Sequence, residues 1–573
     1  MAFITYRISR GRKYWSVVES RRVAGKPKHV ILEYLGSADS LLERLKDKER
    51  SSLKSYSHGD THALLTIAKE LDLVGIINKH VPVGKGGKRP VRDGLTVGAS
   101  FVLAAIGRAC QPTSKMGWYR WCKGTSLEYS LRTSLRDLDS QHFWDQMGFL
   151  PEERIQKIED DLIRQMVETY AVDVSSVLFD TSNFFTFIDS GNDRCRLARR
   201  SKTNKQKRYD LRQIGLGLLI TRKHQFPLLH KTYEGNKNDI SVFKETLSEM
   251  VGRLRRVSTE LSDITFVFDK GNNSKGNFKL LDSQEGLGYV GGLVASYFKD
   301  LIEEANQHLD RIRIDGEATP VYRVRRMVWG SERTCVVLVS KQLREGQIRG
   351  IGQHLEKKYR ELEAFKRQLE NPRRAKKWGK RQIKERLGKI IRGQFIEDIL
   401  KYELVKLEDG SLSFTYDIDS DAFDHLKEEV LGRRILVTNR HDWSSEDIIL
   451  AYRGQAKVEY AFRNLKNPYH LSVRPQYHWT DEKIAAHVFM CVIGYLLTIA
   501  AYTKARQTAG YRNNITTFME DLRSIRLACI KKPKSNRVRY QLEAIPKEVA
   551  KLARTLGISD ENIRRELKLS VYN

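Results

Sequence analysis

Three carboxylates stand where metal-dependent chemistry could use them. Asp180 ends the apolar run DVSSVLFD, Asp269 ends the apolar run ITFVFD, and Glu459 lies in the segment YRGQAKVEYAFRNLK. Apolar runs of this kind predict central strands of a sheet. If both strands and the segment around Glu459 meet at one edge of the sheet, their negative charges repel unless divalent cations neutralise them. Oxygen ligands of this kind favour Mg²⁺, with Mn²⁺ as a substitute.

Two such ions, roughly 3.5–4 Å apart, activate a water or a sugar hydroxyl and stabilise the leaving oxygen of a phosphodiester. Asp180, Asp269 and Glu459 are therefore predicted to be both the catalytic residues and the ligands of two metal ions. The alternative is structural, because an aspartate at the end of a strand often only begins a turn.

The segment around Glu459 also carries a polar stripe. Tyr452, Glu459 and Lys466 recur every seven residues, which is two helical turns and brings side chains to nearly the same azimuth. Four residues close to that azimuth are predicted to bind DNA phosphates: Tyr452, Gln455, Arg463 and Lys466. Three apolar residues on an adjacent side are predicted to pack on the sheet: Val458, Phe462 and Leu465. The alternative is a solvated face with helix-spaced charges.

The composition favours a polyanionic partner. The 573 residues include 101 Lys and Arg against 71 Asp and Glu, which gives a net charge of +30 and a pI of about 9.7. Nucleic acid is the first candidate and a membrane surface is its competitor. The N-terminus has no apolar run long enough for a signal peptide, and the six cysteines are scattered singly, without zinc spacing. These features predict a cytoplasmic protein.

One segment imitates a membrane span. Residues 484–503 are twenty residues without a formal charge. The segment contains His487 and stands alone in a highly charged chain. We therefore predict a helix buried in a large core and no membrane partner.

The chain is too long for one hydrophobic core, and its periodicity changes several times. The fold class predicted is α/β, with a mixed-sheet core that is interrupted by an insertion. The predicted units, in chain order, are a small β-rich region and candidate DNA contact over 1–58, a helical DNA-binding domain over 59–170, the first part of the core over 171–299, an inserted α/β lobe with a basic helical stretch over 300–430, the second part of the core over 431–510, and a C-terminal helical tail over 511–573.

Together these blocks resemble a known family. YRGQAKVEYAFRNLK is similar to the Y-(2)-R-(3)-E-(6)-K signature of the insertion-sequence DDE transposases of the IS-four branch, particularly the IS-sixteen-thirty-four-like members. Tyr452, Glu459 and Lys466 match, whereas Gln455 stands where the signature has Arg, so a neutral hydrogen-bonding group replaces a charged fork. VLFDTS, YEGNKND, VFDKGNNS and RPQYHWTDEKIAAHVF are similar to further blocks of that family, and the similarity covers roughly residues 1–510.

The resemblance implies an RNase H-like catalytic core with an insertion between Asp269 and Glu459. It implies a DNA transposase of a bacterial insertion sequence, a nuclease and strand transferase that cleaves transposon ends with Mg²⁺ and joins them to target DNA. The implied partners are double-stranded DNA, as terminal inverted repeats and as target, and a second copy of the chain in a homodimer on DNA. The implied location is the bacterial nucleoid.

Further features could serve the same reaction. Four cations of the basic stretch in the lobe are predicted to contact DNA: Arg373, Arg374, Lys376 and Lys377. The run from Arg194 to Arg212 carries nine Lys and Arg and is either a solvated loop or a DNA-contacting one. In the family an aromatic of the inserted lobe can lie beside a flipped base, which makes Trp329 the candidate, with a core or turn tryptophan as the alternative.

Two rival functions stay open. One is a catalytically silent DNA-binding descendant of such an enzyme, which the intact carboxylates argue against. The other is a two-carboxylate hydrolase such as a glycosidase, which the net charge of +30 argues against.

Overall fold

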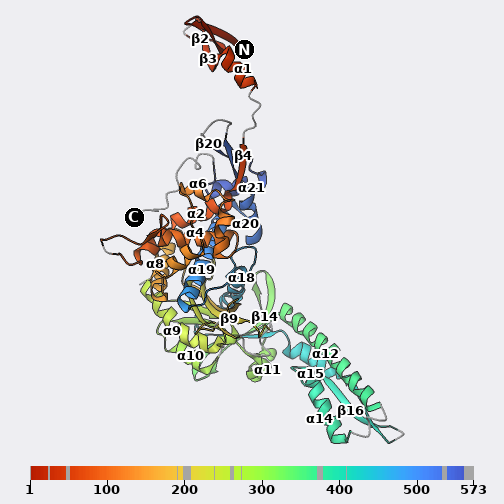
Figure 1. The fold of residues 1–573 in the computed structure, drawn as a ribbon. Coiled ribbons are helices and arrows are strands. Elements are labelled where there is room, and N and C mark those ends of the chain that lie inside the picture. Colours follow the sequence, from red (N-terminus) through yellow and green to blue (C-terminus); the bar gives the residue numbers. More distant parts are fainter. Residues whose placement is uncertain are drawn as a thin grey trace.

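The chain forms a mixed α/β protein. The computed structural model describes residues 2–23, 26–46, 52–84, 86–189, 191–197, 208–237, 239–257, 263–272, 274–370, 378–407, 410–531 and 538–559. Figure 1 shows an elongated molecule with a small N-terminal sheet at one end and a helical lobe at the other. The large sheet and the apolar helices lie between them.

A mixed sheet of ten strands forms the centre of the described residues. Its order is β10-β9-β7-β11-β12-β18-β15-β14-β13, and β8 pairs with β9 beside this path. Strands β7, β11 and β12 run parallel to one another, and the other neighbours are antiparallel. The strands are β7 Ser176–Phe185, β8 Arg196–Leu197, β9 Arg212–Thr221, β10 Pro227–Glu234, β11 Thr265–Phe268, β12 Gly288–Leu293, β13 Asp310–Ile314, β14 Glu317–Val328, β15 Ser331–Val339 and β18 Arg433–Thr438.

Helices cover both faces of this sheet, which explains why β11 and β12 are buried along their whole length. On one face lie α9 (Asp239–Val257) and α10 (Lys275–Asp282), and the ring of Phe243 is 5.7 Å from that of Phe179 and 5.0 Å from that of Phe268. On the other face α18 (Gln455–Leu465) packs on β7, where the rings of Phe462 and Phe184 are 6.4 Å apart. The predicted mixed sheet is confirmed, including the hairpin β9–β10.

The region over 59–170, predicted as a helical DNA-binding domain, is mostly helical, with one short two-stranded sheet. Its elements are α2 Gly59–Glu70, α3 Leu73–Lys79, β5 Val91–Arg92, β6 Leu95–Thr96, α4 Val97–Cys110, η1 Lys115–Gly117, α5 Trp118–Cys122, α6 Leu127–Leu131, α7 Ser140–Met147 and α8 Glu152–Tyr170. The apolar segment forms α19 (Asp481–Lys504), which packs against α2, α4, α7 and α8.

By length and composition α19 with the turn that follows it, over 481–509, passes as a candidate membrane span, yet its apolar window is entirely buried inside the protein. A Cβ added at Gly494 would lie 2.9 Å from the carbonyl oxygen of Ala105, so α19 and α4 approach closely at this glycine. The prediction of a buried core helix is confirmed, and such a helix is compatible with a soluble globular protein.

The two chain ends differ from the prediction. An antiparallel sheet of β1 Ala2–Ser9, β2 Arg12–Val23 and β3 Lys26–Ser37 precedes α1 (Ala38–Lys46), as expected for a β-rich start. Strand β4 (Ser52–Ser57), however, pairs with β19 near the C-terminus. The described residues of the predicted helical tail over 511–573 therefore form a mixed unit of α20 Ile515–Ser524, β19 Arg526–Lys531, β20 Val538–Leu542 and α21 Lys547–Thr555, which the π-helix η5 Ala505–Ala509 precedes. Strand pairing across the whole chain is not visible in local periodicity, which is why β4 was assigned to the N-terminal region.

The inserted lobe is smaller than the predicted 300–430. Strands β13, β14 and β15 belong to the central sheet, because β15 pairs with β18, and α11 (Lys299–Gln307) packs beside them. The lobe itself has a separate apolar core around Leu362, Phe365, Leu387 and Phe414. Its elements are α12 Lys341–Glu370, α14 Lys380–Ile391, α15 Ile396–Ile399, β16 Leu400–Lys406, β17 Leu412–Ile418, α16 Ser420–His425 and η4 Leu426–Val430.

Candidate active site

Asp180 of β7 and Asp269, directly after β11, follow the same register pair of two neighbouring parallel strands. The register pairs Phe268 of β11 with Phe179 of β7, so the next residue of each chain is an aspartate. Phe179 and Phe268 both pack against Phe243 on one face of the sheet. Because side chains alternate along a strand, both aspartates point toward the opposite face, which α18 covers.

Asp180 does not end its strand as the sequence predicted. Strand β7 continues to Phe185, whereas β11 stops at Phe268, directly before Asp269. Polar residues after Asp180 were read as a turn, but they continue the pairing with β9, since Ser182 and Asn183 oppose Leu216 and Gly215. The shorter neighbour β11 leaves this edge of β7 open, so both carboxylates are only half-buried.

Tyr452 is buried rather than exposed on a polar stripe. It lies in α17 (Ser445–Arg453), and its phenol donates a hydrogen bond of 2.9 Å to Oδ1 of Asp269. A Cβ at Gly292 would approach the phenol oxygen to 2.5 Å, so a glycine in β12 is needed to admit the ring. Burial and the Asp269 carboxylate raise the pKa of Tyr452 well above its ordinary value, while Arg434, 5.5 Å from the ring, opposes the shift. The phenol therefore stays a hydrogen-bond donor at neutral pH.

Gln455 fastens the next helix to β7. The expected single helix is divided at Gly454, and Gln455 begins α18. Its side chain is buried, and Nε2 donates a 3.0 Å hydrogen bond to the carbonyl oxygen of Phe179. The carbonyl belongs to the residue before Asp180, so Gln455 fixes the distance between the helix and the carboxylate strand. Gln455 and Tyr452 were predicted to be exposed and to bind phosphate. Both side chains are instead buried and hydrogen-bonded inside the protein.

Glu459 lies on α18 between two contacts with β7. Gln455 precedes it by one turn, and Lys466 follows it by two turns, with Nζ 2.5 Å from Oγ of Ser182. The three residues have nearly the same azimuth, so Glu459 lies on the side of the helix that faces the strand near Asp180. Its side chain is exposed.

Lys466 is half-buried at the end of this row. Burial and the neighbouring Arg474 lower the pKa of Lys466, and the Asp180 carboxylate acts in the opposite sense. An ammonium group thus lies within electrostatic reach of the first aspartate. It is a candidate for binding the phosphate of a substrate at this edge.

Among the described residues, no group of three or more His, Cys, Asp and Glu side chains is close enough to hold a metal ion. The two aspartates follow neighbouring strands, and α18, which carries the exposed Glu459, packs on β7. All donors of this set are carboxylate oxygens, the kind that suits Mg²⁺ or Mn²⁺.

The remaining predicted residues differ in their surroundings. Arg463 is exposed, with its guanidinium 5.8 Å from the ring of Tyr460. Trp329 has a φ of +51° in the turn between β14 and β15, and its ring packs 4.9 Å from that of Phe278, which fits the alternative of a turn tryptophan. Burial is confirmed for the three apolar residues of α18: Val458, Phe462 and Leu465. Four predicted DNA contacts lie outside the described residues: Arg373, Arg374, Lys376 and Lys377.

Arg108 was missed by the sequence analysis. It lies in the apolar helix α4 and is buried, and its guanidinium donates to the carbonyl oxygens of Thr113 at 2.7 Å, of Arg474 at 2.6 Å and of Ser472. It therefore ties the segment that follows α18 to the helical domain. The only sequence signal is a single arginine inside an otherwise apolar helix.

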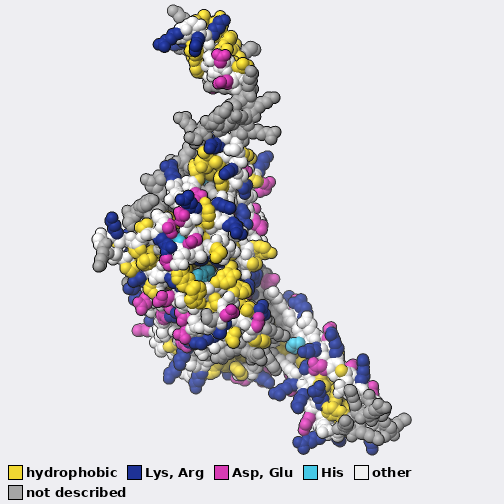
Figure 2. Space-filling view, in the orientation of Figure 1, with side chains coloured by type: hydrophobic (Ala, Val, Ile, Leu, Met, Phe, Trp, Pro, Cys, Tyr) yellow, Lys and Arg dark blue, Asp and Glu magenta, His cyan; other side chains and the backbone are white. Residues whose placement is uncertain are grey.

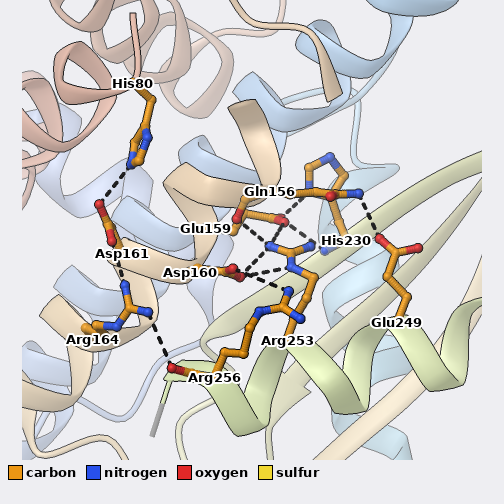
Figure 3. A network of polar contacts seen from close by, with 10 residues as sticks. All are labelled: His80, Gln156, Glu159, Asp160, Asp161, Arg164, His230, Glu249, Arg253 and Arg256. Atoms are coloured by element: carbon orange, nitrogen blue, oxygen red, sulfur yellow. Dashed lines mark hydrogen bonds and ion pairs between the residues drawn. The ribbon is translucent and has the colours of Figure 1, made fainter. Parts of the chain in front are cut away.

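A buried ionic network joins the helical domain to the sheet (Figure 3). Glu159 of α8 accepts hydrogen bonds from the ring of His230 in β10 and, at 2.9 Å, from Arg253 in α9. Arg253 also donates to Asp160 at 2.9 Å. Burial acts to raise the pKa of Glu159, but His230 and Arg253 outweigh it and hold that pKa below its ordinary value. The network thus fixes α8, β10 and α9 to one another.

No protein-family model matches the chain, and no curated protein matches it closely enough to indicate a relative. The chemistry of the site therefore follows from the types and positions of its own residues.

Proposed function

We propose that the protein is a DDE transposase of a bacterial insertion sequence, which cuts DNA at transposon ends and transfers the freed strand into target DNA. One observation carries the proposal: Asp180 and Asp269 each follow one member of the register pair Phe179–Phe268 of the parallel strands β7 and β11, and the helix that bears Glu459 packs on β7. An edge with two carboxylates, a third on an overlying helix and an ammonium beside them has the groups that phosphodiester displacement needs.

The proposal includes an RNase H-like core. Its support is the arrangement of five strands in the order β10-β9-β7-β11-β12. Along the chain, β7, β9 and β10 come first and form an antiparallel meander. The next two strands, β11 and β12, lie on the other side of β7 and run parallel to it. The long insertion that the resemblance implies then corresponds to β13–β15 together with the lobe.

The carboxylate set fits a divalent cation by donor chemistry, since three carboxylates without nitrogen or sulfur donors suit a hard ion. Among the described residues the three carboxylates are not gathered closely enough to hold an ion. Brought together, Asp180, Asp269 and Glu459 would hold Mg²⁺, which would lower the pKa of an attacking water or 3′-hydroxyl and stabilise the leaving oxygen. Tyr452 orients the Asp269 carboxylate, and Gln455 holds α18 at a fixed height above Phe179.

The surroundings of the site support a DNA substrate. Lys466 presents an ammonium beside Asp180, and Arg463 lies exposed on the same helix. Figure 2 shows Lys and Arg side chains spread over the described part of the lobe, in keeping with a net charge of +30. A cationic surface of this kind binds the phosphate backbone without regard to sequence. The proposal places the enzyme in the nucleoid, as a homodimer that pairs two transposon ends.

The test is a nicking assay on a duplex that carries the DNA flanking the coding region. The wild-type protein should cut at the element boundary only with Mg²⁺ or Mn²⁺. Asp180→Asn, Asp269→Asn and Glu459→Gln should each abolish cutting while end binding survives. Asp263→Asn is the matched control, because Asp263 lies at the opposite end of β11 and pairs with Arg440. Metal-independent cutting, or full activity in a triad variant, would contradict the proposal.

A further inference from the structure

An exposed aromatic surface lies beyond the end of the strand that carries Asp180. Between α18 and α19 the chain alternates: Tyr477 and Trp479 are 50% and 56% exposed, whereas Gln476 and His478 are buried. Phe187, two residues past the end of β7, is also 50% exposed, and its ring lies 5.9 Å from that of Tyr477. Phe187, Tyr477 and Trp479 are called the aromatic ledge below.

The ledge is held rigidly from beneath. The amide of Gln476 donates from Nε2 to the carbonyl oxygen of His478 at 3.0 Å, and its Oε1 lies 2.9 Å from Nδ1 of the same histidine. The backbone N–H of Phe187 donates to the carbonyl oxygen of Gln476 at 3.1 Å. The ring of Trp144 stacks on Trp479 with centroids 4.3 Å apart. A fixed backbone therefore holds three large aromatic rings exposed to solvent, which is typical of a binding surface.

The ledge continues the line of the candidate active site. Strand β7 leads from Asp180 past Ser182, which binds Lys466, to Phe187, over about 20 Å at the rise of an extended strand. Arg474, which lies in electrostatic contact with Lys466, begins the segment that carries Tyr477. The carboxylates, two cations and the ledge thus follow one another along a single edge.

The segment 191–197, which carries Arg194 and Arg196, contacts the ledge through Asn192. Asn192 donates from Nδ2 to the carbonyl oxygen of Trp479 at 2.8 Å. Arg196, four residues later, has a half-exposed side chain and an ion pair of 3.0 Å with Asp193. Aromatic rings between cations are the combination that binds unpaired nucleotides, because bases stack on the rings while the cations neutralise phosphates.

We propose that the aromatic ledge stacks unpaired bases of the DNA strand that passes the carboxylate site. The inference rests on the proposed function only in taking DNA as the substrate. Stacking tolerates any sequence, since every base offers a π-face, so the ledge would bind a separated end strand whatever its sequence. A second copy of the chain is the competing occupant, and the experiment separates the two.

The experiment measures the affinity of the full-length protein, without metal, for fluorescein-labelled oligothymidine and for a duplex of equal length. Tyr477→Ala and Trp479→Ala should each weaken single-strand binding about tenfold and leave duplex binding unchanged. Trp479→Phe should retain most of the affinity, because a ring remains. Tyr469→Ala is the matched control: Tyr469 is 78% exposed in the same connection but outside the ledge, and its loss should change neither affinity.

Equal weakening by Tyr469→Ala, or unchanged single-strand binding in both ledge variants, overturns the inference. So does a ledge variant that alters self-association in sedimentation without DNA while single-strand binding stays intact, since the occupant is then a protein. The result is independent of cleavage. If the wild-type protein does not nick DNA but the ledge variants lose single-strand affinity, only the proposed function is overturned. If the wild type nicks normally but the ledge variants bind single strands as well as it does, only the inference about the ledge is overturned.

Discussion

The phenol of Tyr452 and the carboxylate of Asp269 are joined by a hydrogen bond of 2.9 Å, so a side chain of α17 holds the aspartate that follows β11. This contact gives Tyr452 an orienting role, whereas the sequence had suggested a phosphate contact.

The contact predicts a specific phenotype for Tyr452→Phe. Removing one hydrogen bond to an ionised group should slow cleavage about tenfold while DNA affinity and its salt dependence stay unchanged. Single-turnover cleavage and binding isotherms on the same DNA end provide the measurement. A fall in the salt slope with normal cleavage would instead restore the phosphate-binding role.

Removing a carboxylate from the site should relieve repulsion in the metal-free protein. Asp180→Asn is therefore expected to melt no lower than wild type without Mg²⁺, and to gain less on its addition, because a ligand that binds only the folded state stabilises it. Melting curves with and without Mg²⁺ test this. A purely structural role of Asp180 within β7 predicts the opposite, a loss of about 1 kcal/mol in either condition.

Lys466→Ala should weaken end binding and lower the slope of log affinity against log salt by about one unit, because one phosphate contact is lost. Lys457→Ala is the matched control, since Lys457 lies on the same helix but donates to the carbonyl oxygen of Arg222 at 2.8 Å. Equal slopes for both variants would mean that Lys466 only fastens α18 to Ser182.

The lobe should contribute DNA affinity through its basic stretch. Neutralising four cations together should weaken binding steeply at moderate salt and little at low salt: Arg373, Arg374, Lys376 and Lys377. The control removes four exposed cations from the C-terminal unit: Arg539, Lys547, Lys551 and Arg554. If both quadruple variants lose the same DNA affinity, the loss reflects only the lower net charge of the protein and not a contact made by the lobe.

The network of Figure 3 predicts a pH-dependent stability. Arg253→Met leaves Glu159 with one partner fewer in a buried site and should cost about 3 kcal/mol at neutral pH. The pKa of Glu159 is depressed in the folded state, so the stabilisation is complete above its ordinary value of 4.5 and is lost as the pH falls through the lower folded value. The difference between variant and wild type should therefore shrink in acid. Urea unfolding across this pH range measures it.

Arg256→Met is the control for that network. Arg256 is 65% exposed and lies 4.0 Å from Asp160, so its removal should have little effect at any pH. A cost equal to that of Arg253→Met would show that burial does not set the strength of these ion pairs.

Apolar runs and helical periodicity predicted the mixed sheet, the buried helix α19 and the packing of Val458 and Phe462, because each depends on local pattern and burial. Periodicity could not reveal which distant strands pair. Residues 317–339 looked like part of an insertion, yet their strands extend the central sheet through β18.

The site shows the same limit. The carboxylate site of Asp180, Asp269 and Glu459 stays a prediction. A single azimuth for Tyr452 and Lys466 presumed one unbroken helix. The division at Gly454 and the hydrogen bonds to Asp269 and Phe179 turn Tyr452 and Gln455 inward. Arg108 acts through three backbone carbonyls, a role that no residue pattern displays.

The position of β18 between β12 and β15 has a consequence for how the protein is made. The ribosome must finish the lobe before β18 can enter the sheet, and α18 reaches β7 only after more than half of the chain has emerged. Until then Asp180 and Asp269 lack the helix that carries Glu459. Under the proposed function, a nascent or prematurely terminated chain would consequently bind DNA through its basic surfaces without being able to cut it.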